Sequence, residues 1–232
     1  MSPHISMLSR RRWLTLLILA VLLLIIVGFP LVANADSVVF SNLGPGNTYL
    51  KGSGIGVWGI TSDVGKKFGY SQSYAVAFMP STLFNLTQIS VAISWISGFN
   101  GVTLTLNSTS NGRPGTVITT WNFFALPSLG TTNSTLQTMT FSGIILQPGQ
   151  TYWIVASPYS QNTHIAWNGN SIGAISLDAY NLGHGWGLTS EVAGAFQVLG
   201  KPAVPEPSTL FLLGNGLLGI AAAALRGRNR SQ

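Results

Sequence analysis

Cysteine is absent from this chain, and charged residues are scarce. None of the 232 residues is cysteine, which excludes structural disulfides, thiolate metal sites and thiol catalysis. Asp, Glu, Lys and Arg together make up only 7% of the sequence. General acids, general bases and most metal ligands come from ionisable side chains, so a chain with so few of them offers little catalytic material. We therefore expect a protein that is not an enzyme and that carries no metal or cofactor.

The positive charge that is present lies at the two ends of the chain. The formal net charge is +6, and three arginines near the N-terminus and three near the C-terminus account for all of it. Residues 36–200 hold four basic and four acidic residues, so this central part is neutral. Nucleic-acid binding requires a clustered basic face, and we expect no nucleic-acid partner.

The N-terminal segment has the pattern of a secretory signal peptide. Arg10-Arg11-Arg12 precedes an apolar run over residues 13–32, and Ala33-Asn34-Ala35 follows as an A-x-A cleavage site. We predict that residues 1–35 direct the chain to the export machinery and are removed by signal peptidase after Ala35. An uncleaved membrane anchor is the alternative.

The C-terminal segment combines three features in order. Residues 201–209 form a proline-rich linker, and its prolines fix φ and remove N–H donors, which keeps it extended. Residues 210–225 are mostly apolar and predict a transmembrane helix roughly 24 Å long. Residues 226–232 form a basic cytoplasmic tail that stops transfer across the membrane. The arginines of this tail are Arg226, Arg228 and Arg230.

This C-terminal segment resembles the PEP-CTERM sorting signal. The resemblance is carried by the linker motif together with the apolar run and the arginines that follow it. It implies processing at or near the motif by the membrane protease-transpeptidases called exosortases, after transient anchoring in the inner membrane. The product would then reach the cell envelope or the exterior. A permanent C-terminal anchor is the alternative. The motif residues are Val204, Pro205, Glu206, Pro207, Ser208 and Thr209.

Short alternating stretches predict that residues 36–200 form one β domain. Apolar and polar residues alternate from Ile89 to Trp95, which predicts a half-buried strand. Four large residues in a row at 152–155 predict a strand buried on both faces. About ten such stretches, separated by turn residues, predict an all-β, jelly-roll-like β-sandwich. The signal helix and the transmembrane helix would flank it, and an up-and-down barrel is the alternative.

Four short segments within residues 74–200 form a recognisable set, namely Asn111–Val117, Leu146–Trp153, Ala166–Asn168 and Ala195–Val198. On these segments the chain is similar to the extracellular β-modules named choice-of-anchor domains, particularly the R type. This resemblance implies a β fold and a surface location, and it implies no particular activity.

Two motifs match catalytic patterns without the expected surroundings. Residues 169–173 match G-x-S-x-G, and Asp178 and His184 follow in hydrolase order, but no helix is predicted after the serine. Residues 54–59 match a dinucleotide fingerprint, but we predict no helix over residues 60–67. We interpret both motifs as glycine-rich strands or loops.

The β domain, residues 36–200, which we also call the body, contains few ionisable residues that an enzyme could use. A hydrolase would need two of them within about 6 Å of each other in a pocket. Three of them, His164, Asp178 and His184, are the best zinc candidates, and a calcium site of backbone and side-chain oxygens is a second metal alternative. The full set is Asp63, Asp178, Glu191, His164 and His184.

Six of the seven tryptophans lie in the body, and most are expected in its core. Trp186 lies in a glycine-rich stretch, 182–187, which predicts an exposed ring in a flexible loop. We predict that Trp186 or Tyr180 contacts carbohydrate. The sequence thus indicates an exported envelope or extracellular protein with a structural or binding role in surface material, such as the exopolysaccharide matrix of a biofilm. A lectin-like module and a polysaccharide hydrolase are the alternatives.

Overall fold

The computed structural model describes residues 35–132 and 134–203. The predicted signal peptide, except for Ala35, lies outside the described residues. The sorting motif Val204–Thr209, the predicted transmembrane helix 210–225 and the basic tail 226–232 lie outside them as well. No helix in the described part of the chain is long and apolar enough to cross a membrane.

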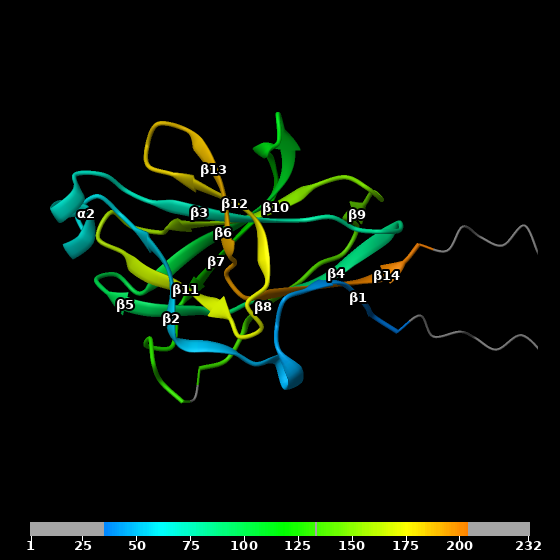
Figure 1. Ribbon diagram of the computed structural model, residues 1–232, viewed down its shortest axis with the longest axis horizontal. Helices are drawn as coiled ribbons and strands as arrows, with labels where there is room; N and C mark the ends of the chain where they lie inside the picture. Colours follow the sequence, from blue (N-terminus) through cyan, green and yellow to red (C-terminus); the bar gives the residue numbers. More distant parts are fainter. Residues whose placement is uncertain (1–34, 133, 204–232) are drawn as a thin grey trace, which may run out of the picture. The chain divides into compact units, whose positions relative to one another are not determined.

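The described chain is almost entirely β-structure (Figure 1). Its first elements are β1 (Ser37–Ser41), the 3-10 turn η1 (Pro45–Asn47), β2 (Tyr49–Trp58), α2 (Asp63–Phe68), β3 (Ser73–Phe78), β4 (Phe84–Val91), β5 (Ile93–Ser97) and β6 (Gly101–Ser110). The remaining strands are β7 (Arg113–Phe124), β8 (Gln137–Thr140), β9 (Ile145–Leu146), β10 (Tyr152–Pro158), β11 (His164–Asn170), β12 (Ile175–Asn181), β13 (Trp186–Val192) and β14 (Phe196–Pro202).

Three sheets enclose one main hydrophobic core. The strand orders are β13-β12-β3-β10-β6-β7, β1-β14-β4-β8 with β9 beside β4, and β2-β11-β5, and the paired strands are antiparallel. Buried residues of all three sheets meet in this core: Ile154 comes from the first, Phe196 from the second and Trp167 from the third. The predicted all-β class is confirmed and the architecture fits a β-sandwich. The jelly-roll-like connectivity stays a prediction.

The predicted single strand from Ile89 to Trp95 is wrong, because the chain changes sheets in the middle of it. Ala92 separates β4 from β5 and is fully buried. Its N–H donates to the Ala195 carbonyl (3.0 Å) and its carbonyl accepts from the Asn168 N–H (2.7 Å). Ile89 and Ile93 both pack into the main core. The alternating pattern therefore continues through the crossing, since both strands face the same apolar interior.

Two further predictions on local structure are corrected. Residues 63–68 form a short helix, α2, where none was predicted; Ser62 caps it by accepting a hydrogen bond from the Gly65 N–H (2.9 Å). Residues 182–187 are not wholly a loop, because β13 begins at Trp186. This strand lies at the edge of its sheet and is largely exposed, so it lacks the apolar alternation by which strands are recognised.

The described chain enters and leaves the domain at the same place. β1 pairs with β14, and Ser37 lies opposite Gly200. Figure 1 shows these first and last strands together, with α2 and β5 at the other end of the domain. The segment that leads into the sorting motif therefore starts from one end of the sandwich. We call the other end, with α2 and the turns around residues 98–100 and 159–163, the distal end.

Buried asparagine side chains satisfy backbone groups where strands leave their sheets. Asn168 is fully buried; its Nδ2 donates to the carbonyls of Leu50 (2.9 Å) and Lys51 (3.1 Å), and its Oδ1 accepts from the Ser94 hydroxyl (2.8 Å). Asn42 likewise donates to the Gly194 carbonyl and accepts from the Phe196 N–H. Leu50 and Lys51 are exposed, but Ser94, Gly194 and Phe196 are buried, and unpaired polar groups would be costly at those three positions, so the amides are structural requirements.

We expect Asn168→Leu to destabilise the domain by about 2–4 kcal/mol, because it keeps the approximate size of the side chain but leaves two carbonyls and a hydroxyl without their partner. Urea unfolding followed by tryptophan fluorescence measures this loss. Asn85→Leu, at an exposed position on β4, is the matched control. Equal stability of the two variants would show that the Asn168 hydrogen bonds contribute little.

Candidate functional site

Two of the five ionisable residues considered for an enzyme form a contact at the distal end. His164, the first residue of β11, places its Nδ1 3.0 Å from Oδ1 of Asp63, the first residue of α2. The Ser97 hydroxyl donates to the same carboxylate oxygen (3.1 Å). Burial is the largest single effect and opposes ionisation, but hydrogen bonds from the Val64 N–H, Ser97 and His164, together with electrostatic attraction to His164, lower the pKa of Asp63 overall.

The arrangement of these groups differs from that of a catalytic triad. Ser97 gives its hydrogen bond to the carboxylate, whereas a serine nucleophile must be paired with the imidazole. The Asp63 side chain is 60% exposed and that of His164 is 12% exposed, so the carboxylate of the pair is open to solvent. Asp63 and His164 are therefore as close together as a hydrolase would require, but they do not lie in a pocket.

The serine of the G-x-S-x-G motif lies elsewhere. The Ser171 hydroxyl, in the turn after β11, donates to the Thr48 carbonyl (3.1 Å). Asp178 is buried in β12, and His184 lies in the exposed turn before β13. Within the described residues no three histidines or carboxylates gather as metal ligands, so His164, Asp178 and His184 do not form the zinc site considered above.

Gly54 and Gly56 of the dinucleotide-like motif lie inside β2, and Gly59 directly follows this strand. This strand pairs antiparallel with β11, so the motif is not part of a βαβ unit. A Cβ atom on Gly54 would lie 2.2 Å from the Trp167 carbonyl oxygen. Close approach of two backbones is therefore the reason for glycine at this position.

A cleft lies between the η1–β2 segment and residues 134–136. Its volume is about 370 Å³, and Tyr49 and Lys51 lie in its lining. The Lys51 ammonium already donates to the Thr132 carbonyl. The residues of the Asp63–His164 pair do not line this cleft.

Asp178 is a buried carboxylate with an incomplete set of partners. Its Oδ1 accepts from the Ser176 hydroxyl (2.6 Å), while Oδ2 has no hydrogen-bond partner. Burial raises the pKa of Asp178 to about 6, and the Glu191 carboxylate contributes in the same direction, whereas the Ser176 hydrogen bond and the nearby Tyr74 hydroxyl lower it. Glu191 itself accepts a hydrogen bond from the Tyr180 hydroxyl. An ionised Asp178 therefore destabilises the fold at neutral pH.

We expect Asp178→Asn to raise stability at pH 7.5 by roughly 1–2 kcal/mol. The folded-state pKa lies above the unfolded value, so the stabilising effect of protonation is complete below pH 3.8 and is lost as the pH rises through about 6. The gain should therefore shrink towards pH 4. Thermal unfolding from pH 4 to 8 tests this, with exposed Asp36→Asn as the control. A gain that does not vary with pH would contradict the assignment.

The two predicted carbohydrate contacts do not share a surface. Tyr180 packs against the main core and its ring centre lies 5.1 Å from that of Tyr74. Trp186 pairs with Asn181, the next residue along β12, and therefore faces the opposite side of the sheet. There it is half-buried and packs with a second small cluster around Trp153. A contact between Trp186 and carbohydrate stays a prediction, but Tyr180 cannot belong to the same binding face.

Exposed aromatic rings gather instead at the distal end, at positions that the sequence analysis missed. Phe68, at the end of α2, is 52% exposed, and its ring centre lies 5.9 Å from that of Tyr70 and 6.1 Å from that of Trp58. The centres of Trp58 and Tyr70 are also 6.1 Å apart. Three mutually equidistant rings cannot stack in one column, so they form a patch with Phe68 as its most exposed member.

A second aromatic cluster comes from three other segments. Phe99 follows β5, Phe124 ends β7 and Tyr159 follows β10, and their rings are 42%, 50% and 46% exposed. Phe99 stacks on Tyr159 with centres 5.5 Å apart, and Phe124 meets Tyr159 edge-on at 4.7 Å. Phe68, Phe99 and Tyr159 each stand beside glycine, asparagine, proline or serine in the sequence. Aromatic residues next to turn residues were the signal that could have revealed them.

Hydrogen bonds join the segments that carry the two clusters. The Thr163 hydroxyl donates to the Phe99 carbonyl (3.2 Å), and the Thr163 carbonyl accepts from the N–H of Gly59 (2.9 Å), next to Trp58. The Thr61 N–H donates to the Gln161 carbonyl (2.8 Å). The turn at 159–163, which carries Tyr159 of the second cluster, is therefore held both to Phe99 and to the segment next to Trp58 of the first cluster.

Comparison with known proteins identifies the C-terminal segment. Residues 203–229 match the PEP-CTERM protein-sorting motif, which confirms the sorting signal predicted from Val204–Thr209 and the residues after it. No curated protein matches the chain. The motif marks an exported protein that a C-terminal membrane anchor holds until an exosortase processes it at the membrane.

Proposed function

We propose that this exported, exosortase-sorted protein has a structural or binding role, without enzymatic activity, in the polysaccharide matrix at the cell surface. The observation that carries the proposal is the sorting motif at residues 203–229, because it marks the chain as an exported protein. In this proposal signal peptidase cuts after Ala35, with Ala33 as the other small residue of its site. An exosortase then acts at or near Pro205-Glu206-Pro207.

The composition of the domain supports a binding role over a catalytic one. Residues 36–200 are neutral, and the Asp63–His164 pair has a solvent-exposed carboxylate and lacks a nucleophile paired with the imidazole. The resemblance to choice-of-anchor domains of the R type supports a surface module of jelly-roll-like architecture, and both remain part of this proposal.

A lectin-like module is the second candidate function, and one observation favours it. The distal end exposes several aromatic rings on hydrogen-bonded turns. Aromatic rings held in this way pack against the C–H faces of sugars, while nearby amides bind hydroxyl groups. Carbohydrate binding would be one way for the protein to occupy a polysaccharide matrix.

We expect replacement of Pro205, Glu206 and Pro207 by alanine to leave an unprocessed precursor in the membrane fraction. The wild-type protein should instead yield a mature form that starts at Asp36 and lacks most of the segment after Pro207. Intact mass measurement and fractionation of cells with and without the exosortase show both forms. Lys201→Ala, just ahead of the motif, is the control and should be processed normally. Normal processing of the triple variant would argue against an exosortase acting at this motif.

We also expect the mature protein to co-purify with extracellular polysaccharide. Digestion of the washed matrix with polysaccharide-degrading enzymes should release most of it into the soluble fraction, as detected by immunoblotting. Protease-free buffer without these enzymes is the control. Recovery of the mature protein entirely in the culture medium before digestion would contradict the matrix role.

A further inference from the structure

We propose that the distal end of the domain is a binding surface for an acidic polysaccharide, such as a uronic-acid polymer. This proposal rests on the proposed matrix role and names the surface and the ligand class that would account for it. We define the distal aromatic surface by six residues. These are Lys67, Phe68, Tyr70, Phe99, Phe124 and Tyr159.

Exposure of the aromatic rings is the first argument. Phe68, Phe99, Phe124 and Tyr159 are each between 42% and 52% exposed, and they come from four separate segments. Clustered exposed aromatic groups, of which this end carries two sets, are unusual on a soluble domain and mark surfaces that bind something. The rings are held in place, because Phe99 and Tyr159 are stacked and the turns that carry them are hydrogen-bonded through Thr163. Ordered rings lose little conformational entropy when a ligand packs on them.

Charge at the same end indicates an anionic ligand. The Lys67 ammonium lies 5.6 Å from the centre of the Phe68 ring, so a positive charge and an exposed ring are presented together. Lys66 is its neighbour on α2, and both lysines are exposed. The nearby acid, Asp63, already accepts hydrogen bonds from Ser97 and His164. In a domain that is neutral overall, this is a local excess of positive charge beside apolar rings.

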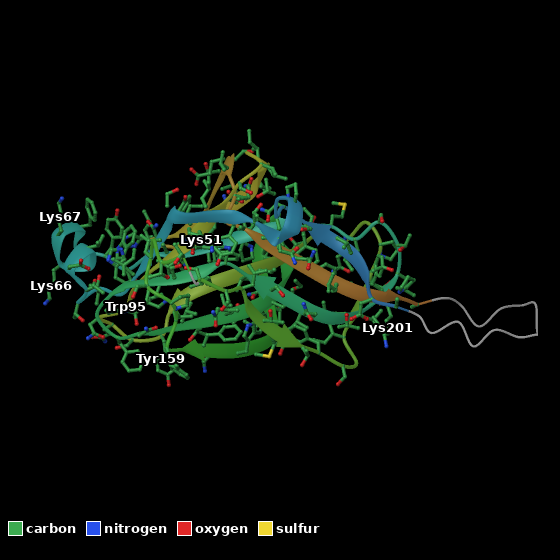
Figure 2. The ribbon with its side chains drawn as sticks, turned by 90° about the horizontal axis from the view of Figure 1, so that it is seen from below. Lys51, Lys66, Lys67, Trp95, Tyr159 and Lys201 are labelled. Atoms are coloured by element: carbon green, nitrogen blue, oxygen red, sulfur yellow. The ribbon has the colours of Figure 1, made fainter. Side chains whose placement is uncertain are left out.

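The position of this surface favours a polysaccharide over a lipid bilayer. Figure 2 shows Lys66 and Lys67 at the end of the domain opposite Lys201, with Tyr159 and Trp95 on the same half as these two lysines. Lys201 lies in β14, which leads directly into the sorting segment. The aromatic rings and the membrane-directed segment therefore belong to opposite ends of the sandwich. A surface placed there is free to bind material beyond the membrane while the chain is still anchored.

Binding by the full-length protein tests this surface. The protein is reconstituted in phosphatidylcholine nanodiscs, which accommodate its apolar ends. Biolayer interferometry then measures binding to immobilised polygalacturonate, to dextran and to captured vesicles containing phosphatidylglycerol. We expect binding to polygalacturonate that weakens from about 0.05 M to about 0.5 M salt, with weaker binding to dextran. Capture by the vesicles in place of polygalacturonate would identify a lipid surface and overturn the proposal, as would equal binding to dextran.

Variants locate the surface. Phe68→Ala and Tyr159→Ala should each weaken binding to polygalacturonate about tenfold, as expected for loss of an anchoring aromatic ring. Lys66→Gln combined with Lys67→Gln should weaken it several-fold and reduce its salt dependence. Ile175→Ala, which removes a 68% exposed side chain from β12, and Lys201→Gln, at the opposite end, are the matched controls. Unchanged circular dichroism and urea midpoints confirm that each variant is folded.

The outcomes separate this surface from the broader matrix role. If both aromatic variants still bind polygalacturonate as tightly as the wild type, the distal aromatic surface is not the binding site, whereas the proposed matrix role is unaffected. A wild-type protein that binds none of the polysaccharides would overturn the surface, whereas the matrix role would then depend on the co-purification described above. Neither result depends on whether the exosortase processes the tail.

Discussion

The sandwich depends on satisfying backbone polar groups at the places where the chain passes from one sheet to another. A strand that leaves its sheet inside an apolar core leaves N–H and C=O groups without ladder partners, and each such group is costly to bury. In this protein asparagine amides and neighbouring backbone groups fill that need. Asn168 joins β11 to β5 and to the start of β2, and Asn42 joins the end of β1 to residues 194–196. With these crossings satisfied, three sheets of different sizes enclose one continuous core.

A scarcity of charge shapes the rest of the molecule. The core excludes ionisable groups almost completely, and the buried Asp178 is an exception whose pKa is raised to about 6 by burial. The surface has few charges to steer partners from a distance, so binding must come from contact. The exposed aromatic rings of the distal end provide such contact area, and they lie away from the end at which the chain enters and leaves the domain. A tether at one end and exposed aromatic rings at the other would suit the matrix role that we propose for this membrane-sorted protein.

Most of the strands were predictable, because each depends on short-range alternation or on a short buried run. The prediction for residues 152–155 is confirmed, since Tyr152 to Val155 are all buried in the central strand β10. The stretch from Ile89 to Trp95 was wrongly predicted as one strand. Alternation of apolar and polar residues shows only which side chains face the core, and it does not show that β4 and β5 belong to different sheets. β13 was missed because an exposed edge strand carries little apolar signal. The short helix α2 was missed because six residues give too few turns for a helical pattern, although Ser62 and Gly69 were present as its caps.

The amino-acid sequence by itself determined how this protein is handled. The sorting signal is read by other proteins as a linear segment, so its meaning lies in residue order and survives without any fold, and the matched motif at residues 203–229 confirms that reading. The absence of cysteine and the neutral body are likewise properties of composition.

The tertiary structure alone decided which side chains meet. Phe68, Phe99, Phe124 and Tyr159 lie on four segments far apart in the chain, and they become two clusters at one end only because antiparallel pairing and hydrogen-bonded turns bring those segments together. Local patterns cannot encode that meeting, because it depends on pairings between residues dozens of positions apart.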